Sequence, residues 1–217
     1  MNSAEPLSLQ QKGFLYRRAW ILAAITVFYN VIEGLVSVLF GLEDKTLSLF
    51  GFGLDSFVEV ISGAGVWHMT KRFGRNNDAD PDTFEQLALR ITGIAFYILA
   101  FGLIITSLLH FYLGHKPDTT FWGIVVAGVS ILSMWLLMHS KIKVGKQLKS
   151  QAILADAGCT KTCIYLSVVL LAASMIYEFT GFGGVDSIGT IVIAILSFKE
   201  GREAFQKAKC IMCSCKK

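Results

Sequence analysis

The stretch ITGIAFYILAFGLIITSLL, residues 91–109, contains no charged residue, and it decides the class of fold. A helix on the surface of a soluble bundle carries a polar face along its length, and this stretch has none. It is also about as long as a helix must be to cross the hydrocarbon core of a bilayer, which takes ~20 residues. We therefore expect a transmembrane helix here.

Similar apolar runs occur on both sides of this stretch. The predicted spans are residues 19–41, 47–70, 91–114, 121–139, 152–177 and 182–198. The second and fifth are interrupted by ionisable residues. Across the 217 residues, 53% are hydrophobic and 17% are charged, whereas about 25% of a soluble domain is charged. The sequence therefore predicts an all-α membrane protein with six transmembrane helices.

Lysine and arginine gather on one side of this predicted topology. They occupy the N-terminal arm, the tail and the second and fourth loops, where Lys141 is the first lysine of the fourth loop. The other side has only Lys45 and Lys116. This bias predicts that both termini are cytoplasmic, in a multi-pass protein of a bacterial inner (plasma) membrane. It also accounts for the net charge of +4 without a nucleic-acid partner. The expected parts are a cytoplasmic arm 1–18, a transmembrane domain 19–198 and a Cys-rich cytoplasmic tail 199–217.

The segment LDSFVEVISG, residues 54–63, places two carboxylates inside an apolar run. Asp55 and Glu59 are four residues apart, so they share one face of a helix. An ionised side chain at membrane depth costs at least ~2.5 kcal/mol and normally faces the interior of the bundle. A purely structural role remains open, in which a protonated pair holds helices together, although one Ser or Asn would do this at lower cost.

The segment ADAGCTKTC, residues 155–163, supplies a second polar stripe. Asp156, Cys159, Thr160 and Cys163 follow the i, i+3, i+4, i+7 spacing of one helix face. Opposite the two carboxylates, Cys159 and Cys163 would complete a set of two oxygens and two sulfurs, with Asp156 and Thr160 close by. Such a set suits tetrahedral Zn²⁺, and Cd²⁺ or Hg²⁺ as the share of sulfur rises. Helical geometry disfavours a disulfide between these thiols. Small core residues are the alternative for both.

The remaining three cysteines are concentrated in the tail, as Cys210, Cys213 and Cys215. On a reducing cytoplasmic side, C-x₂-C-x-C indicates metal binding before disulfide formation. We expect an accessory metal site there, with palmitoylation or incidental thiols as the alternative.

Both polar segments resemble the cation diffusion facilitator family of metal/proton antiporters. In that family helix two carries D-x-x-x-D and helix five carries H-x-x-x-D, and together they form the transport site. SLFGFGLDSFVEVISG, residues 48–63, is similar to the helix-two region, with its acidic positions at Asp55 and Glu59. ILADAGCTKTCIYLS, residues 153–167, is similar to the helix-five region, with Cys159 at the His position and Cys163 at the Asp position.

The likeness is strongest to a short branch in which the usual C-terminal cytoplasmic domain is absent and helix five reads A-D-x-x-x-T-x-x-C. This resemblance implies a secondary transporter, not an enzyme, that exports a divalent transition metal from the cytoplasm as a homodimer. It implies Zn²⁺ as the usual cargo, with Co²⁺ or Fe²⁺ possible, whereas the thiols favour Cd²⁺, Hg²⁺ or even Cu⁺.

Exchange for protons follows from the ligand chemistry, because carboxylates and thiols must lose their protons to bind a metal. Two other classes of protein are the alternatives. A zinc peptidase would need H-E-x-x-H, which does not occur, and a non-transporting metal sensor or metal-delivery protein would use the cysteine tail. The role of Lys161 stays open, because its ammonium could pair with Glu33 or could reach the site as a substitute for the metal cation.

Overall fold

The computed structural model describes residues 9–73, 82–114, 116–148 and 151–214, and within them it is all-helical. The elements are α1 (Leu9–Glu43), α2 (Leu47–Phe73), α3 (Asp82–Leu113), α4 (Phe121–Leu148), α5 (Gln151–Thr180) and α6 (Gly184–Ser214). The predicted all-α, six-helix membrane fold is confirmed. By length and composition, helices α1 to α5 contain stretches able to cross a membrane. Helices α1 and α6 run past the predicted ends of the transmembrane domain.

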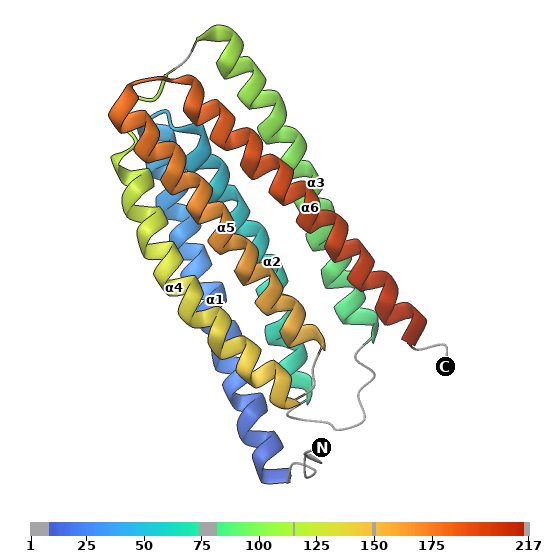
Figure 1. The fold of residues 1–217 in the computed structure, drawn as a ribbon. Helices are drawn as coiled ribbons and strands as arrows, with labels where there is room; N and C mark the ends of the chain where they lie inside the picture. Colours follow the sequence, from blue (N-terminus) through green and yellow to red (C-terminus); the bar gives the residue numbers. More distant parts are fainter. Residues whose placement is uncertain (1–8, 74–81, 115, 149–150, 215–217) are drawn as a thin grey trace, which may run out of the picture.

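The helices form a four-membered ring with a pair packed beside it (Figure 1). Helices α1, α2, α5 and α4 contact one another in that cyclic order, while α3 and α6 run antiparallel and pack mainly on each other. Helix α2 also contacts both members of that pair, so it is the central helix of the molecule. Its membrane-spanning stretch is 61% buried, against 33–39% for the four other spans. Polar side chains on α2 are therefore shielded from lipid.

Helices α1 and α2 approach closely because glycines line their contact. A Cβ added at Gly53 would lie 2.8 Å from Ser37 Cβ, and one at Gly41 would lie 2.6 Å from the backbone nitrogen of Phe50. Small residues of this kind let backbones of membrane helices come together. The close approach brings the polar residues of α1 within reach of those on α2.

Helix α2 is anchored at its first turn by a carboxylate from α6. Asp186 accepts hydrogen bonds from the backbone amides of Leu47, at 2.8 Å, and Ser48, at 3.0 Å, and from the Ser48 hydroxyl. An acidic group at this position satisfies the free amides and complements the helix dipole. This contact fixes the start of α6 against the start of α2.

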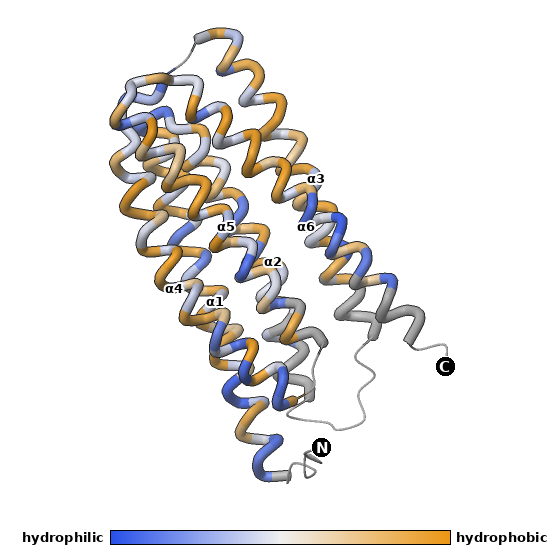
Figure 2. Tube along the Cα trace, viewed as in Figure 1, coloured by the Kyte–Doolittle hydropathy of each residue, from blue (hydrophilic) through white to orange (hydrophobic). Residues whose placement is uncertain are grey.

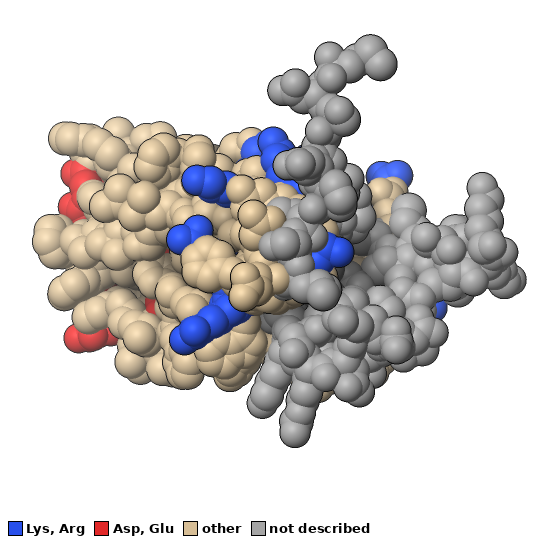
Figure 3. All heavy atoms as spheres, turned by 90° about the horizontal axis from the view of Figure 1, so that it is seen from below, with Lys and Arg blue, Asp and Glu red and all other residues tan. Residues whose placement is uncertain are grey.

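Polar and charged residues separate towards the two ends of the bundle (Figures 2 and 3). The hydropathy colouring shows apolar residues along the middle of the helices and hydrophilic residues towards the end where α1 begins and α6 ends. Seen from that end, the visible charges are mainly lysine and arginine, and the acidic side chains lie at the far edge. At the opposite end, Lys45 pairs with Asp118 at 3.0 Å. This separation agrees with the pattern of basic residues in the sequence.

Candidate metal-binding site in the bundle

Two carboxylates and one thiol converge in the interior of the bundle. One ligand atom from each of Asp55, Glu59 and Cys163 lies within 4.8 Å of the other two. All three residues are buried, with exposed fractions of 1%, 5% and 0%. Atoms that share one Zn²⁺ lie roughly 3.5 Å apart, since each metal–ligand bond is about 2.0–2.3 Å long. Small side-chain adjustments would therefore let this trio hold one cation.

The fold explains why these three residues meet. Asp55 and Glu59 are one turn apart on central helix α2, and α5, which carries Cys163, packs directly against α2. Neighbouring helices then orient the carboxylates. Ser197 Oγ of α6 donates to Asp55 Oδ1 at 3.0 Å, and Asn30 Nδ2 of α1 donates to Glu59 Oε2 at 2.8 Å. These bonds use one oxygen of each carboxylate, and the second oxygen is not committed to them.

A third buried carboxylate, that of Glu33 in α1, contacts the residue that follows Asp55 in α2. It accepts hydrogen bonds from Tyr29 Oη at 3.0 Å and from Ser56 Oγ of α2 at 3.1 Å. Its own exposed fraction is 6%. Glu33 therefore ties α1 to α2.

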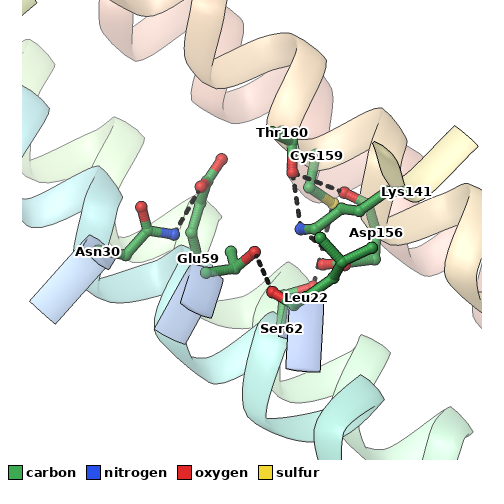
Figure 4. Close-up of polar contacts among 9 residues, drawn as sticks. Leu22, Asn30, Glu59, Ser62, Lys141, Asp156, Cys159 and Thr160 are labelled. Carbon is green, nitrogen blue, oxygen red and sulfur yellow. Dashed lines mark hydrogen bonds and ion pairs between the residues drawn. The ribbon is translucent and has the colours of Figure 1, made fainter. Parts of the chain in front are cut away.

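Asp156 and Thr160 do not join the trio, because both are held by a buried lysine (Figure 4). Lys141 Nζ of α4 lies 2.7 Å from Asp156 Oδ2 and donates to Thr160 Oγ1 at 2.9 Å. The Thr160 hydroxyl in turn donates to the backbone carbonyl of Asp156 at 3.1 Å. The assignment of Lys141 to a cytoplasmic loop was wrong. Helix α4 continues to Leu148 instead of ending near residue 139, and it turns Lys141 inward with only 1% of that residue exposed.

Cys159 lies away from the trio, although it is one turn from Cys163. Its Sγ is 4.0 Å from Ser62 Oγ of α2, and the residue is partly exposed. As expected, no disulfide joins Cys159 and Cys163. The structure thus brings together three of the six residues proposed from the sequence. The tail residues Cys210, Cys213 and Cys215 lie outside the described side chains.

Neither placement considered for Lys161 is found. Its side chain is exposed, and its ammonium lies over the Tyr165 ring, 5.6 Å from the ring centroid. Lys161 is on the outer face of α5, whereas Asp156, Thr160 and Cys163 lie on the inner face. The ring offers its ammonium a cation–π contact.

Three hydrogen-bonding partners of the proposed site residues were not assigned to the site from the sequence, namely Lys141, Ser197 and Asn30. Lys141 had a detectable signal, because Ser130, Met134, Leu137 and Lys141 recur at the spacing of one helix face. These four residues are all buried. Ser197 and Asn30 gave no such signal, since their roles depend on which helices become neighbours.

Apolar helices around a buried cluster of two carboxylates and a thiol are typical of an integral membrane protein of the transporter class. Residues 19–212 match the family described as the cation efflux transmembrane domain, and the chain belongs to that family. Its members are cation transporters and not enzymes. The family resemblance drawn from the sequence is confirmed.

Two transporters are similar to the chain over most of its length. An uncharacterized transporter of Methanocaldococcus jannaschii is 25% identical over 179 residues, which is 81% of this chain and 63% of that protein. The manganese efflux system protein MneP of Bacillus subtilis is 25% identical over 191 residues, which is 83% of this chain and 64% of that protein. The matched part of the chain therefore spans less than two thirds of the length of either relative.

Proposed function

We propose that this chain is a secondary transporter that moves a divalent transition-metal cation out of the cytoplasm in exchange for protons. The observation that carries the proposal is the convergence of Asp55, Glu59 and Cys163 in the bundle interior. Buried carboxylates in a membrane span need a cation partner or a proton. A metal ion bound by the trio would supply that partner, and the family membership makes the ion a cargo.

The donor set of the trio favours a borderline ion. Two carboxylate oxygens and one thiolate sulfur match the ligand types that Zn²⁺ accepts, and a water molecule would complete a tetrahedron. Co²⁺, Fe²⁺ and Cd²⁺ are the other ions considered, with Hg²⁺ as the softest. MneP bears the name of a manganese efflux protein. Mn²⁺ prefers oxygen ligands, so the thiolate of Cys163 argues for Zn²⁺ ahead of Mn²⁺.

Proton exchange follows from the same donors. Asp55, Glu59 and Cys163 bind a metal only after losing their protons, so loading the site releases protons and emptying it takes them up. We infer that both termini face the cytoplasm, because the basic residues gather at that end of the bundle. The family resemblance also suggests a homodimer, which we propose on that ground alone.

A transport assay on purified protein in liposomes tests the proposal. The vesicles hold a metal-sensitive dye in an acidic lumen, so that outward proton flow drives metal inward. Zn²⁺, Cd²⁺, Mn²⁺ and Mg²⁺ are offered singly and in competition. We expect Zn²⁺ and Cd²⁺ to enter in proportion to the pH gradient, and Mg²⁺ to stay outside.

Two results of this assay would contradict the proposal. One is that no transition metal enters vesicles containing folded protein. The other is metal entry that is indifferent to the proton gradient, which would leave transport but remove the exchange. Removing residues 210–217 should leave transport largely intact, because none of these residues belongs to the trio. Loss of all function would instead favour a metal sensor that uses the tail cysteines.

A further inference from the structure

The buried lysine of α4 is placed to act on the metal site. Lys141 is 1% exposed, and its ammonium is bound by Asp156 and Thr160 of α5. The two helices are so close there that a Cβ added at Gly145 would lie 2.9 Å from the Leu154 side chain. The lysine is therefore fixed in the interface between α4 and α5 and cannot reach water without a rearrangement.

The residues that hold this lysine are on the same face of α5 as a member of the trio. Thr160 precedes Cys163 by three residues and Asp156 precedes it by seven, which are one and two helical turns. The ion pair is thus the next polar layer of the bundle after the trio, towards the end where α1 begins.

Stability alone is a weak explanation for this pair. Taking two charges out of water costs about as much as their attraction returns, and apolar residues of similar size often stabilise a protein as well. Ionisable residues in membrane spans usually mark a functional site. Lys141 holds the two remaining oxygen donors of the α5 stripe, which would otherwise be available to a cation.

We propose that Lys141 limits the affinity of the metal site, because it withholds Asp156 and Thr160 from the ion and keeps a positive charge in the neighbouring layer. This inference rests on the function proposed above. Its consequence is a site with three protein ligands and moderate affinity. A transported ion must leave again, and a fourth anionic ligand with no lysine nearby would bind a divalent cation more tightly.

A double-mutant cycle on a single-thiol protein tests this assignment. In the full chain, Cys159, Cys210, Cys213 and Cys215 are replaced by serine, so that Cys163 is the only thiol. Binding of Cd²⁺ is followed by the ultraviolet charge-transfer absorption of the cadmium–thiolate bond. Lys141→Met, Asp156→Asn and the double variant are compared with this parent, and thermal unfolding without metal is recorded for each.

The two single variants should shift the affinity in opposite directions. Lys141→Met should lower the Kd for Cd²⁺ by about tenfold or more, because Asp156 becomes available and a repelling charge is lost. Asp156→Asn should raise the Kd by about tenfold, because the ammonium is left uncompensated next to the site. The double variant should return to within roughly threefold of the parent.

A purely structural ion pair would give a different pattern, in which both single variants unfold earlier and both bind Cd²⁺ equally or less tightly. That pattern overturns the inference. Lys141→Gln removes the charge but keeps a donor for Thr160, so it replaces the methionine variant if that variant does not fold, and the same tightening is expected. Parent protein without a cadmium–thiolate absorption would overturn the proposed function instead.

Discussion

Buried carboxylates occupy two neighbouring layers of this bundle, and the two layers differ in what compensates their charge. Asp156 has a cation supplied by the chain itself, since Lys141 lies 2.7 Å away. Asp55 and Glu59 have neutral partners instead, a serine hydroxyl and an asparagine amide. In the part of the chain that the structure describes, the buried ion pair is the one between Lys141 and Asp156. Lys141 is a permanent cation that compensates Asp156. The layer of Asp55 and Glu59 has no such lysine among the described residues, and we propose that it takes a cation from solution or protons instead.

Neutralising Asp55 should have the largest effect on metal binding and transport. Asp55→Asn keeps the size of the side chain and an acceptor for Ser197 but removes the charge, so we expect metal binding and transport to fall by at least ~100-fold. The measurement is Zn²⁺ uptake into liposomes, with circular dichroism and size-exclusion chromatography to verify folding. Asp118→Asn, at an exposed ion pair with Lys45, is the matched control and should transport like the wild type. Undiminished uptake by folded Asp55→Asn would remove Asp55 from the site.

Replacing the thiol should sharpen the comparison by changing the preferred ion. Cys163→Ser exchanges a soft ligand for a hard one, so Cd²⁺ affinity should fall on the order of 100-fold and Mn²⁺ affinity by less than about tenfold. Competition between the two ions in the uptake assay measures this shift. Cys159→Ser is the control, because the Cys159 Sγ faces Ser62 outside the trio. Equal effects of the two substitutions would show that both thiols bind the ion.

The pairing of Asp55 with Glu59 could be predicted from the sequence because it depends on spacing within a single helix. The separation of Asp55 and Glu59 puts them on one face, and their position in an apolar run sends that face inward. The layer below could not be predicted in the same way. Whether Asp156 meets a metal or a lysine depends on the register between α4 and α5, and α4 ends about two and a half turns beyond the end of its apolar run.

A similar limit applied to Lys161 and Lys141. Both are lysines in or near predicted spans, and hydropathy alone treats them alike. Their fates differ because Lys161 falls between the inward positions of α5, whereas Lys141 continues the buried face of α4. The overall six-helix architecture was accessible, since it follows from the apolar runs. The neighbours of each polar side chain became known only with the packing of the helices.

Removing the amide that orients Glu59 should have a smaller effect than removing a ligand. Asn30→Ala deletes the 2.8 Å hydrogen bond to Glu59 Oε2, and losses of this kind lower metal affinity by about tenfold. Titration of purified protein with Zn²⁺ measures the change. Thr106→Ala serves as a control, because the Thr106 hydroxyl bonds only its own helix, at the Gly102 carbonyl. An Asn30→Ala protein that binds Zn²⁺ as the wild type does would show that Glu59 needs no such support.

The smallest effect is expected at the lysine on the outer face of the bundle. Lys161→Met keeps the length of the side chain and removes its contact with the Tyr165 ring, and such exposed changes alter stability by less than about 0.5 kcal/mol. Zn²⁺ uptake and the Kd for Cd²⁺ should both stay within roughly twofold of the wild type. The contrast with Lys141→Met separates position from charge, since each variant removes one positive charge from the same apolar bundle. If Lys161→Met tightened Cd²⁺ binding as much as Lys141→Met does, the general electrostatic field of the protein would control affinity, and the local contact with Asp156 would not.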